Sequence, residues 1–153
     1  MRESGGLPRE SWVHEKGLPR VCLEPLSAHL GQRLLLATDL SAASRPAERR
    51  AMQLAEETDA RLLILAVVPS STGADHDAVR RLQARTRLAR RRGIDAAGRL
   101  VIGDPAECIL QAAATDGADA IIMGAAQWRA AGGCPCGHVV LHSRCLVLVT
   151  YAA

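Results

Sequence analysis

The segment from Gly103 to Gly124 constrains the fold more than any other part of the chain. It reads as the end of a strand, then a helix, then a second apolar strand that ends in glycine. Asp104 and Pro105 suit the N-cap and first turn of that helix, and Glu107 completes a capping pattern. This is the repeating unit of a parallel α/β sheet, whose ligands bind at the carboxyl ends of the strands.

The same alternation continues along most of the chain. We expect strands at about 33–38, at 62–68, within 96–102, at 119–123 and at 145–150. Helices are expected at about 45–58, at about 76–92, between Asp104 and Gly117, and from Pro135 toward the last strand. Ser44 is the expected N-cap of the first helix, and Gly93 and Gly117 are the expected ends of the next two. The pattern predicts an α/β fold with one five-stranded parallel sheet and helices on both faces. Residues 1–30, rich in Gly and Pro, predict a flexible tail before a single domain at 31–153.

Composition limits the classes of partner. Two Trp, one Tyr and no Phe exclude a platform on which nucleic acid bases stack. Seven arginines lie between Arg80 and Arg92, but they surround most of a helix, so we expect a solvated helix with Leu82, Leu88 and Ala89 toward the core. Nucleic acid is therefore not an expected partner.

Location follows from apolar runs and cysteine usage. No apolar run approaches the ~20 residues that span a bilayer, and the N-terminus lacks the apolar core of a signal peptide, so no membrane association is expected. Five cysteines, three of them clustered late, do not form a secreted disulfide framework. The sequence predicts a cytoplasmic protein.

Motifs spread over residues 33–151 resemble those of the universal stress protein family. The matching segments are Ala37-Thr38-Asp39 with Ser41 and Ser44, Ala66-Val67-Val68-Pro69, Ile102-Gly103-Asp104-Pro105, Ala118-Asp119-Ala120-Ile121-Ile122-Met123-Gly124 and His142-Ser143-Arg144-Cys145-Leu146-Val147-Leu148-Val149. The resemblance implies a strand order of 3-2-1-4-5. It also implies a homodimer that pairs through the last strand, with Leu146 and Leu148 as candidate dimer-edge residues.

Many members of this family bind ATP, so the resemblance makes ATP the candidate ligand. In such members the Asp after the first strand lies beside the nucleotide, and main-chain groups at the end of the second strand meet the adenine. A Gly-x2-Gly-x9-Gly-Ser/Thr loop after the fourth strand holds the ribose and phosphates. The corresponding candidates here are Asp39, Val67, Val68, Gly103, Gly124, Gln127, Gly133 and Cys134.

The phosphate loop departs from the family pattern. Gln127 stands at the second glycine. If the nine-residue spacing is kept, Gly137-His138 takes the place of Gly-Ser. If the loop is aligned backwards from the last strand, Gly133-Cys134 does. We prefer the second register, which makes Cys134 the cap of the last helix with Pro135 in its first turn. Either register lacks a glycine and the hydroxyl, as in a family branch that does not bind ATP.

A late cluster of Cys134, Cys136, His138 and His142, followed by Cys145, supports further readings. Cysteine and histidine are preferred zinc ligands, and His138 and His142 can share a helix face. A thiol at a helix N-terminus can also be reactive, so Cys134 and Cys136 could form a redox pair. The ordinary alternative is a loop and a short helix containing small residues.

Catalytic signatures are missing from the sequence. It has no Gly-x-Ser-x-Gly elbow, no Walker motif, no Gly-x-Gly-x-x-Gly and no His-Glu-x-x-His. We expect a non-enzymatic, cytoplasmic stress-response protein that acts as a dimeric module binding an unknown protein partner, with a degenerate nucleotide cleft. The alternatives are an ATP-binding regulatory switch and a thiol or metal sensor built on Cys134, Cys136 and His138.

Overall fold

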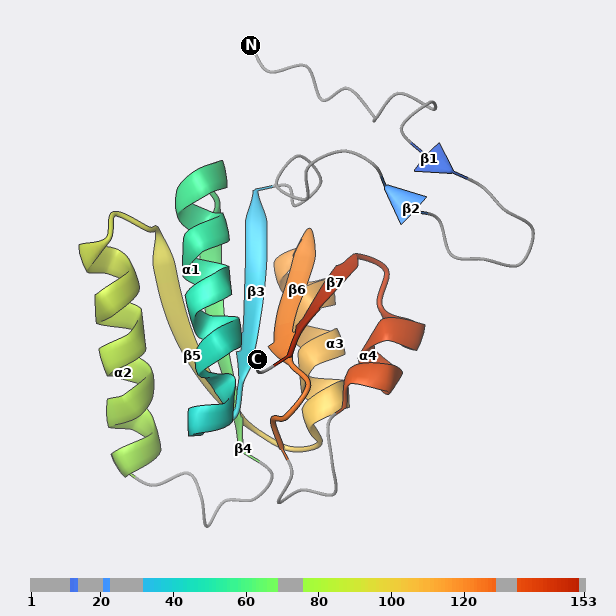
Figure 1. Cartoon of the computed structure of the whole chain (residues 1–153). Helices are drawn as coiled ribbons and strands as arrows, with labels where there is room; N and C mark the ends of the chain where they lie inside the picture. Colours follow the sequence, from blue (N-terminus) through green and yellow to red (C-terminus); the bar gives the residue numbers. More distant parts are fainter. Residues whose placement is uncertain (1–11, 14–20, 23–31, 69–75, 129–134, 152–153) are drawn as a thin grey trace.

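The computed structural model describes residues 12–13, 21–22, 32–68, 76–128 and 135–151 (Figure 1). Its main sheet has five parallel strands in the order β5-β4-β3-β6-β7. This is the predicted 3-2-1-4-5 order counted along the domain. The strands are β3 (Arg33–Thr38), β4 (Arg61–Val68), β5 (Ala96–Ile102), β6 (Ala120–Gly124) and β7 (Leu146–Thr150).

Four α-helices connect these strands and lie on both faces of the sheet, as predicted. They are α1 (Arg45–Thr58), α2 (His76–Arg91), α3 (Pro105–Asp116) and α4 (Cys136–His142), and a short 3-10 turn, η3 (Ala42–Ser44), precedes α1. Figure 1 shows α1 and α2 on one face and α3 and α4 on the other. This arrangement follows from right-handed crossovers, because the chain reverses direction across the sheet after β5.

The core lies in two layers that the central strands separate. Alternate residues of β3 divide between them: Leu34 and Leu36 face α1, whereas Leu35 and Ala37 face α3. All four are at most 1% exposed. A strand covered on both faces is apolar at every position, which explains the unbroken apolar runs in the sequence.

Most helix-end signals are confirmed. The Asp104 carboxylate accepts a hydrogen bond from Glu107 N at 3.0 Å, and Gly93 and Gly117 have φ of +82° and +63°. Ser44 does stand at the N-cap of α1, but its hydroxyl does not cap the helix; its Oγ lies 2.6 Å from both Ser41 O and Glu48 Oε1 and can donate to either.

Two details of the helices differ from the prediction. The N-cap of α4 is Pro135 rather than Cys134, so the proline precedes the first turn instead of lying in it. Leu88 of α2 is 51% exposed, while Leu82 and Ala89 are buried. Leu88 therefore lies on the solvent side of α2, and the helix buries only part of its apolar residues.

Outside the domain, the structure describes two short antiparallel strands within the N-terminal segment. These are β1 (Trp12–Val13) and β2 (Val21–Cys22). The predicted flexible tail otherwise lies outside the described residues. None of the helices in the described ranges is both long and apolar enough to cross a bilayer.

Candidate functional site

Asp39 lies immediately after β3, at the carboxyl edge of the sheet, and its carboxylate is held by the chain itself. Oδ1 accepts hydrogen bonds from Ser41 N at 3.0 Å and Ser41 Oγ at 2.6 Å. Oδ2 accepts from the main-chain N–H of Trp128 at 2.8 Å. Both carboxylate oxygens are thus occupied, one by the turn after β3 and the other by the segment after β6.

Gln127 fills the space beside Asp39. Its side chain is fully buried, and its Oε1 accepts a hydrogen bond from Asp39 N at 3.0 Å. Its Nε2 has no partner among the described residues. A Cβ at Gly124 would lie only 2.9 Å from that nitrogen, so any larger residue there would require the Gln127 side chain to shift.

Trp128 closes the same edge of the sheet. It is 2% exposed, and its indole Nε1 donates a hydrogen bond to the main-chain oxygen of Val67, near the end of β4, at 3.1 Å. Its backbone has φ of +59°, a left-handed conformation that a bulky side chain rarely adopts. Leu40, next to Asp39, also has a positive φ of +63°. Two residues with left-handed backbone therefore adjoin Asp39: Leu40 in the sequence and Trp128 through its hydrogen bond.

A buried polar network contacts the turn that follows β3. Glu48 of α1 is 8% exposed, and its Oε1 accepts from Thr38 Oγ1 at 3.1 Å and Arg85 Nε at 2.6 Å. The guanidinium of Arg85 also donates from Nη2 to Leu40 O at 3.2 Å. Arg85 therefore connects α2 to α1 and to the turn that carries Asp39.

The structure brings most of the predicted cleft residues to one edge. Asp39 contacts Gln127, Gly124 adjoins Gln127, and Gly103 N donates to Val68 O at 3.0 Å. Gly133 and Cys134 lie outside the described residues. Sequence reasoning missed Trp128, which contacts both Asp39 and Val67 here. A large aromatic residue beside a loop expected to be glycine-rich was the available signal.

The cysteine–histidine cluster is only partly assembled. His138 and His142 share a face of α4, with ring centroids 4.3 Å apart. However, no three His, Cys, Asp or Glu side chains within the described residues are placed to hold a metal ion. Both histidines are exposed and Cys136 is half-buried, so the metal reading of this cluster has no support in the part of the chain that the structure describes.

The thiols differ in their state and surroundings. Cys136 is disulfide-bonded, whereas Cys108 and Cys145 are free. Burial raises the pKa of the Cys108 thiol, and the nearby carboxylates of Asp104 and Glu107 raise it further. A raised pKa keeps Cys108 in the less reactive thiol form.

Comparison with known proteins identifies the family. The sequence profile of the universal stress protein family matches residues 31–150. The chain belongs to the universal stress protein family. No curated protein shows significant sequence similarity to it.

Solved structures of family members share the fold. A universal stress protein from Burkholderia pseudomallei is 29% identical, with a TM-score of 0.64 over 84% of this chain and 100% of its own. A universal stress protein in complex with cAMP is 24% identical, with a TM-score of 0.67 over 80% of this chain and 98% of its own. The universal stress protein from Archaeoglobus fulgidus in complex with dAMP is 18% identical, with a TM-score of 0.61 over 78% and 98%.

Proposed function

We propose that this universal stress protein is a non-enzymatic, cytoplasmic stress-response module that acts through dimerisation and a protein partner, with a nucleotide cleft closed by its own residues. One observation carries the proposal: the buried indole of Trp128 donates to the main-chain oxygen of Val67 at 3.1 Å.

The Trp128 indole lies where the family resemblance places the base. The family resemblance implies that adenine meets main-chain groups at the end of the second domain strand, which is β4 here. An indole resembles adenine in two respects: it is a flat aromatic ring system, and it carries an N–H donor at its edge. Because the buried Trp128 indole already donates to Val67 O, a purine that took this position would compete with the indole for the carbonyl.

The groups expected to meet the ribose and phosphates are hydrogen-bonded within the chain. The carboxylate of Asp39 accepts hydrogen bonds at both oxygens, and the Asp39 N–H is paired with Gln127. In the family pattern a glycine at position 127 leaves room for a ligand, but here the buried Gln127 side chain fills it. A nucleotide would have to break three or more existing hydrogen bonds, each worth about 0.5–1.5 kcal/mol net.

Calorimetric titration tests the closed cleft. We expect wild-type protein to give no binding heat with millimolar Mg-ATP, cAMP or dAMP, the last two being the nucleotides bound by relatives. The double variant Gln127→Gly/Trp128→Ala is expected to bind at least one of them. Trp12→Phe is the matched control, since it alters the other tryptophan and leaves the cleft intact. Micromolar binding of ATP by the wild type would instead favour the regulatory-switch alternative.

The dimer part of the proposal rests on β7. This strand lies at the edge of the sheet, pairs only with β6 among the described strands, and carries Leu146 with 37% exposure. An apolar edge strand presents unpaired N–H and C=O groups that a second copy can complete across a twofold axis.

A thiol sensor is the second candidate, because Cys136 is disulfide-bonded. Disulfides of proteins in a reducing compartment are usually transient and serve catalysis or redox sensing. Alkylation of Cys136 before and after treatment with glutathione, read by mass spectrometry, tests this. A thiol that never oxidises within the cellular range of glutathione potentials would rule the sensor out.

A further inference from the structure

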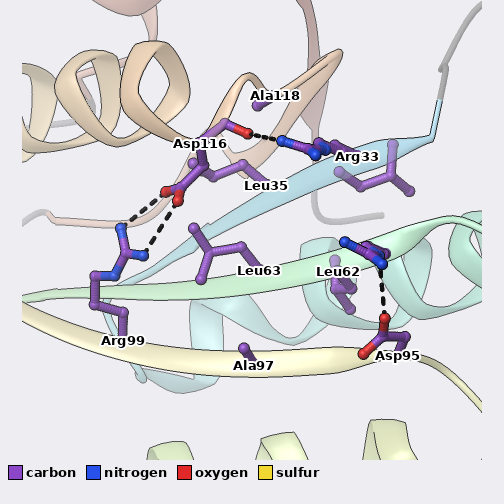
Figure 2. A pocket seen from close by; sticks show the side chains of 11 residues that line it. Arg33, Leu35, Leu62, Leu63, Asp95, Ala97, Arg99, Asp116 and Ala118 are labelled. Atoms are coloured by element: carbon purple, nitrogen blue, oxygen red, sulfur yellow. Dashed lines mark hydrogen bonds and ion pairs between the residues drawn. The ribbon is translucent and has the colours of Figure 1, made fainter.

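A cavity lies on the α3 face of the sheet, over the amino-terminal parts of β3, β4 and β5 (Figure 2). It has a volume of about 320 Å³, near the lower end for small-molecule pockets. Arg33 and Arg61 begin their strands, so this cavity lies at the opposite end of the sheet from Asp39. It is therefore separate from the cleft that Trp128 closes.

The floor of this cavity is an apolar row across three strands. Leu35 pairs in register with Leu63, and Leu63 pairs with Ala97. Leu35 is fully buried, Leu63 is half-buried and Ala97 is exposed, so the cover over the sheet thins toward the edge strand β5. Parallel sheets are ordinarily covered on both faces. Leu63 and Ala97 are therefore apolar positions that lack part of the cover expected for them.

The rim of the cavity carries one positive charge more than it carries negative charges. Asp116, the last residue of α3, accepts a two-point hydrogen bond from Arg99, at 2.8 and 3.2 Å (Figure 2). Asp95 pairs with Arg61 at 3.2 Å. The guanidinium of Arg33 donates from Nη1 to the main-chain oxygen of Asp116 at 2.9 Å.

Arg33 has a carboxylate neighbour that does not neutralise it through a guanidinium contact. Asp119 accepts at Oδ2 from the main-chain N–H groups of Gln32 and Arg33, both at 2.9 Å. Among the described residues no ion pair joins the Arg33 guanidinium to a carboxylate, so its charge is available at the rim.

We propose that this cavity binds a small monocarboxylate with an apolar body, such as a short-chain fatty acid. The carboxylate would accept hydrogen bonds from the free N–H groups of Arg33, whose planar fork suits two-oxygen acceptors. The hydrocarbon chain would lie on the half-buried Leu63 and the exposed Ala97, beside the buried Leu35. Asp95 and Asp116 at the rim disfavour a dianion, and a neutral chain of the same length gains no charge pairing.

Titration of ¹⁵N-labelled full-length protein with sodium hexanoate, followed by NMR, tests the site. We expect saturable shifts at the amides of Leu63, Ala97 and Asp116, and no saturation with 1-hexanol at matched concentrations. If hexanol binds as tightly as hexanoate, or hexanoate shows no saturation by tens of millimolar, the proposal is overturned. Saturable shifts confined to the Asp39 edge would also overturn it, by placing the ligand elsewhere.

Three variants define the chemistry. Arg33→Gln is expected to weaken hexanoate binding about tenfold, because it removes a charge-assisted hydrogen bond to the carboxylate. The side chain at position 33 is exposed in both proteins. Ala97→Leu fills the open end of the apolar row and is expected to abolish saturation. Arg87→Gln, which removes an exposed arginine from α2, is the control and should leave the affinity unchanged. Equal affinities for Arg33→Gln and wild type would exclude Arg33 as the anion-binding group.

Discussion

Trp128 Nε1 donates a hydrogen bond to Val67 O across 3.1 Å, joining two residues 61 positions apart in the sequence. The contact links the segment after β6 to the end of β4, and the main-chain N–H of the same Trp128 holds Asp39 at the end of β3. One residue thus ties three neighbouring strand ends together. Because Trp128 joins the carboxyl ends of β3, β4 and β6, we expect substitutions at these contacts to lower the stability of the fold.

Asp39 is expected to stabilise that unit. The Asp39→Asn variant keeps the shape but replaces one acceptor oxygen with an NH2 group, which cannot accept from Ser41 or Trp128. We expect a loss of about 1–3 kcal/mol in the free energy of unfolding, measured by urea denaturation. Trp128 fluorescence in a Trp12→Phe background should report greater solvent access. The control is Asp59→Asn at the left-handed end of α1, a conformation that Asn tolerates, so its stability should stay close to wild type.

Glu48 should contribute more to stability than any surface ion pair. Its buried carboxylate accepts hydrogen bonds from Thr38, Ser44 and Arg85, and Arg85 itself is largely buried. Glu48→Ala removes the acceptor that these three donors share and leaves the Arg85 charge without its carboxylate partner, so we expect a loss of roughly 2–4 kcal/mol in urea denaturation.

The matched control for Glu48 is Asp95→Ala. Asp95 pairs with Arg61, but both side chains are at least 70% exposed. The expected loss is below about 1 kcal/mol. Equal losses for the two variants would contradict the view that Glu48 supports the turn at Asp39.

The proposed dimer predicts a change in particle mass. Leu148 packs partly against the α1-side core, so a charge there would disturb the fold as well as the edge. Leu146 is more exposed, and Leu146→Arg is expected to convert a dimer to a monomer by charge repulsion across the paired edges. Light scattering coupled to size exclusion measures the mass. Leu88→Arg on α2, at 51% exposure, should leave it unchanged. A wild-type monomer, or an unaltered Leu146→Arg dimer, would argue against pairing through β7.

Cys108 should react slowly with alkylating agents. Burial, then the charges of Asp104 and Glu107, raise its pKa, so less thiolate is present at a given pH than in an unfolded peptide. The alkylation rate at pH 8, followed by mass spectrometry, is expected to fall below that of a peptide thiol and to rise at higher pH. Glu107→Gln removes one charge that raises the pKa and should speed the reaction. An unchanged rate in that variant would exclude Glu107 as a cause and leave burial and Asp104.

Local signals account for the accuracy of the predicted elements. The strand at 96–102 and the helices at 45–58 and 105–116 coincide with β5, α1 and α3, because apolar periodicity and helix caps depend on neighbours within a few residues. The prediction failed at α4, where Pro135 rather than Cys134 is the N-cap. That segment has no cap residue with a strong preference, so its start could not be placed from composition.

The cleft shows what local signals do not carry. The sequence alone placed Asp39, Val67 and Gly124 at strand ends, and it identified Gln127 as a departure from the family loop. It could not show that Gln127 turns back to pair with Asp39, or that Trp128 reaches Val67, since these contacts join residues 61 to 89 positions apart. Short-range pattern fixes which residues come to the edge of the sheet. Which of them fill the space there depends on the close packing of side chains from separate strands, and only the tertiary structure determines that.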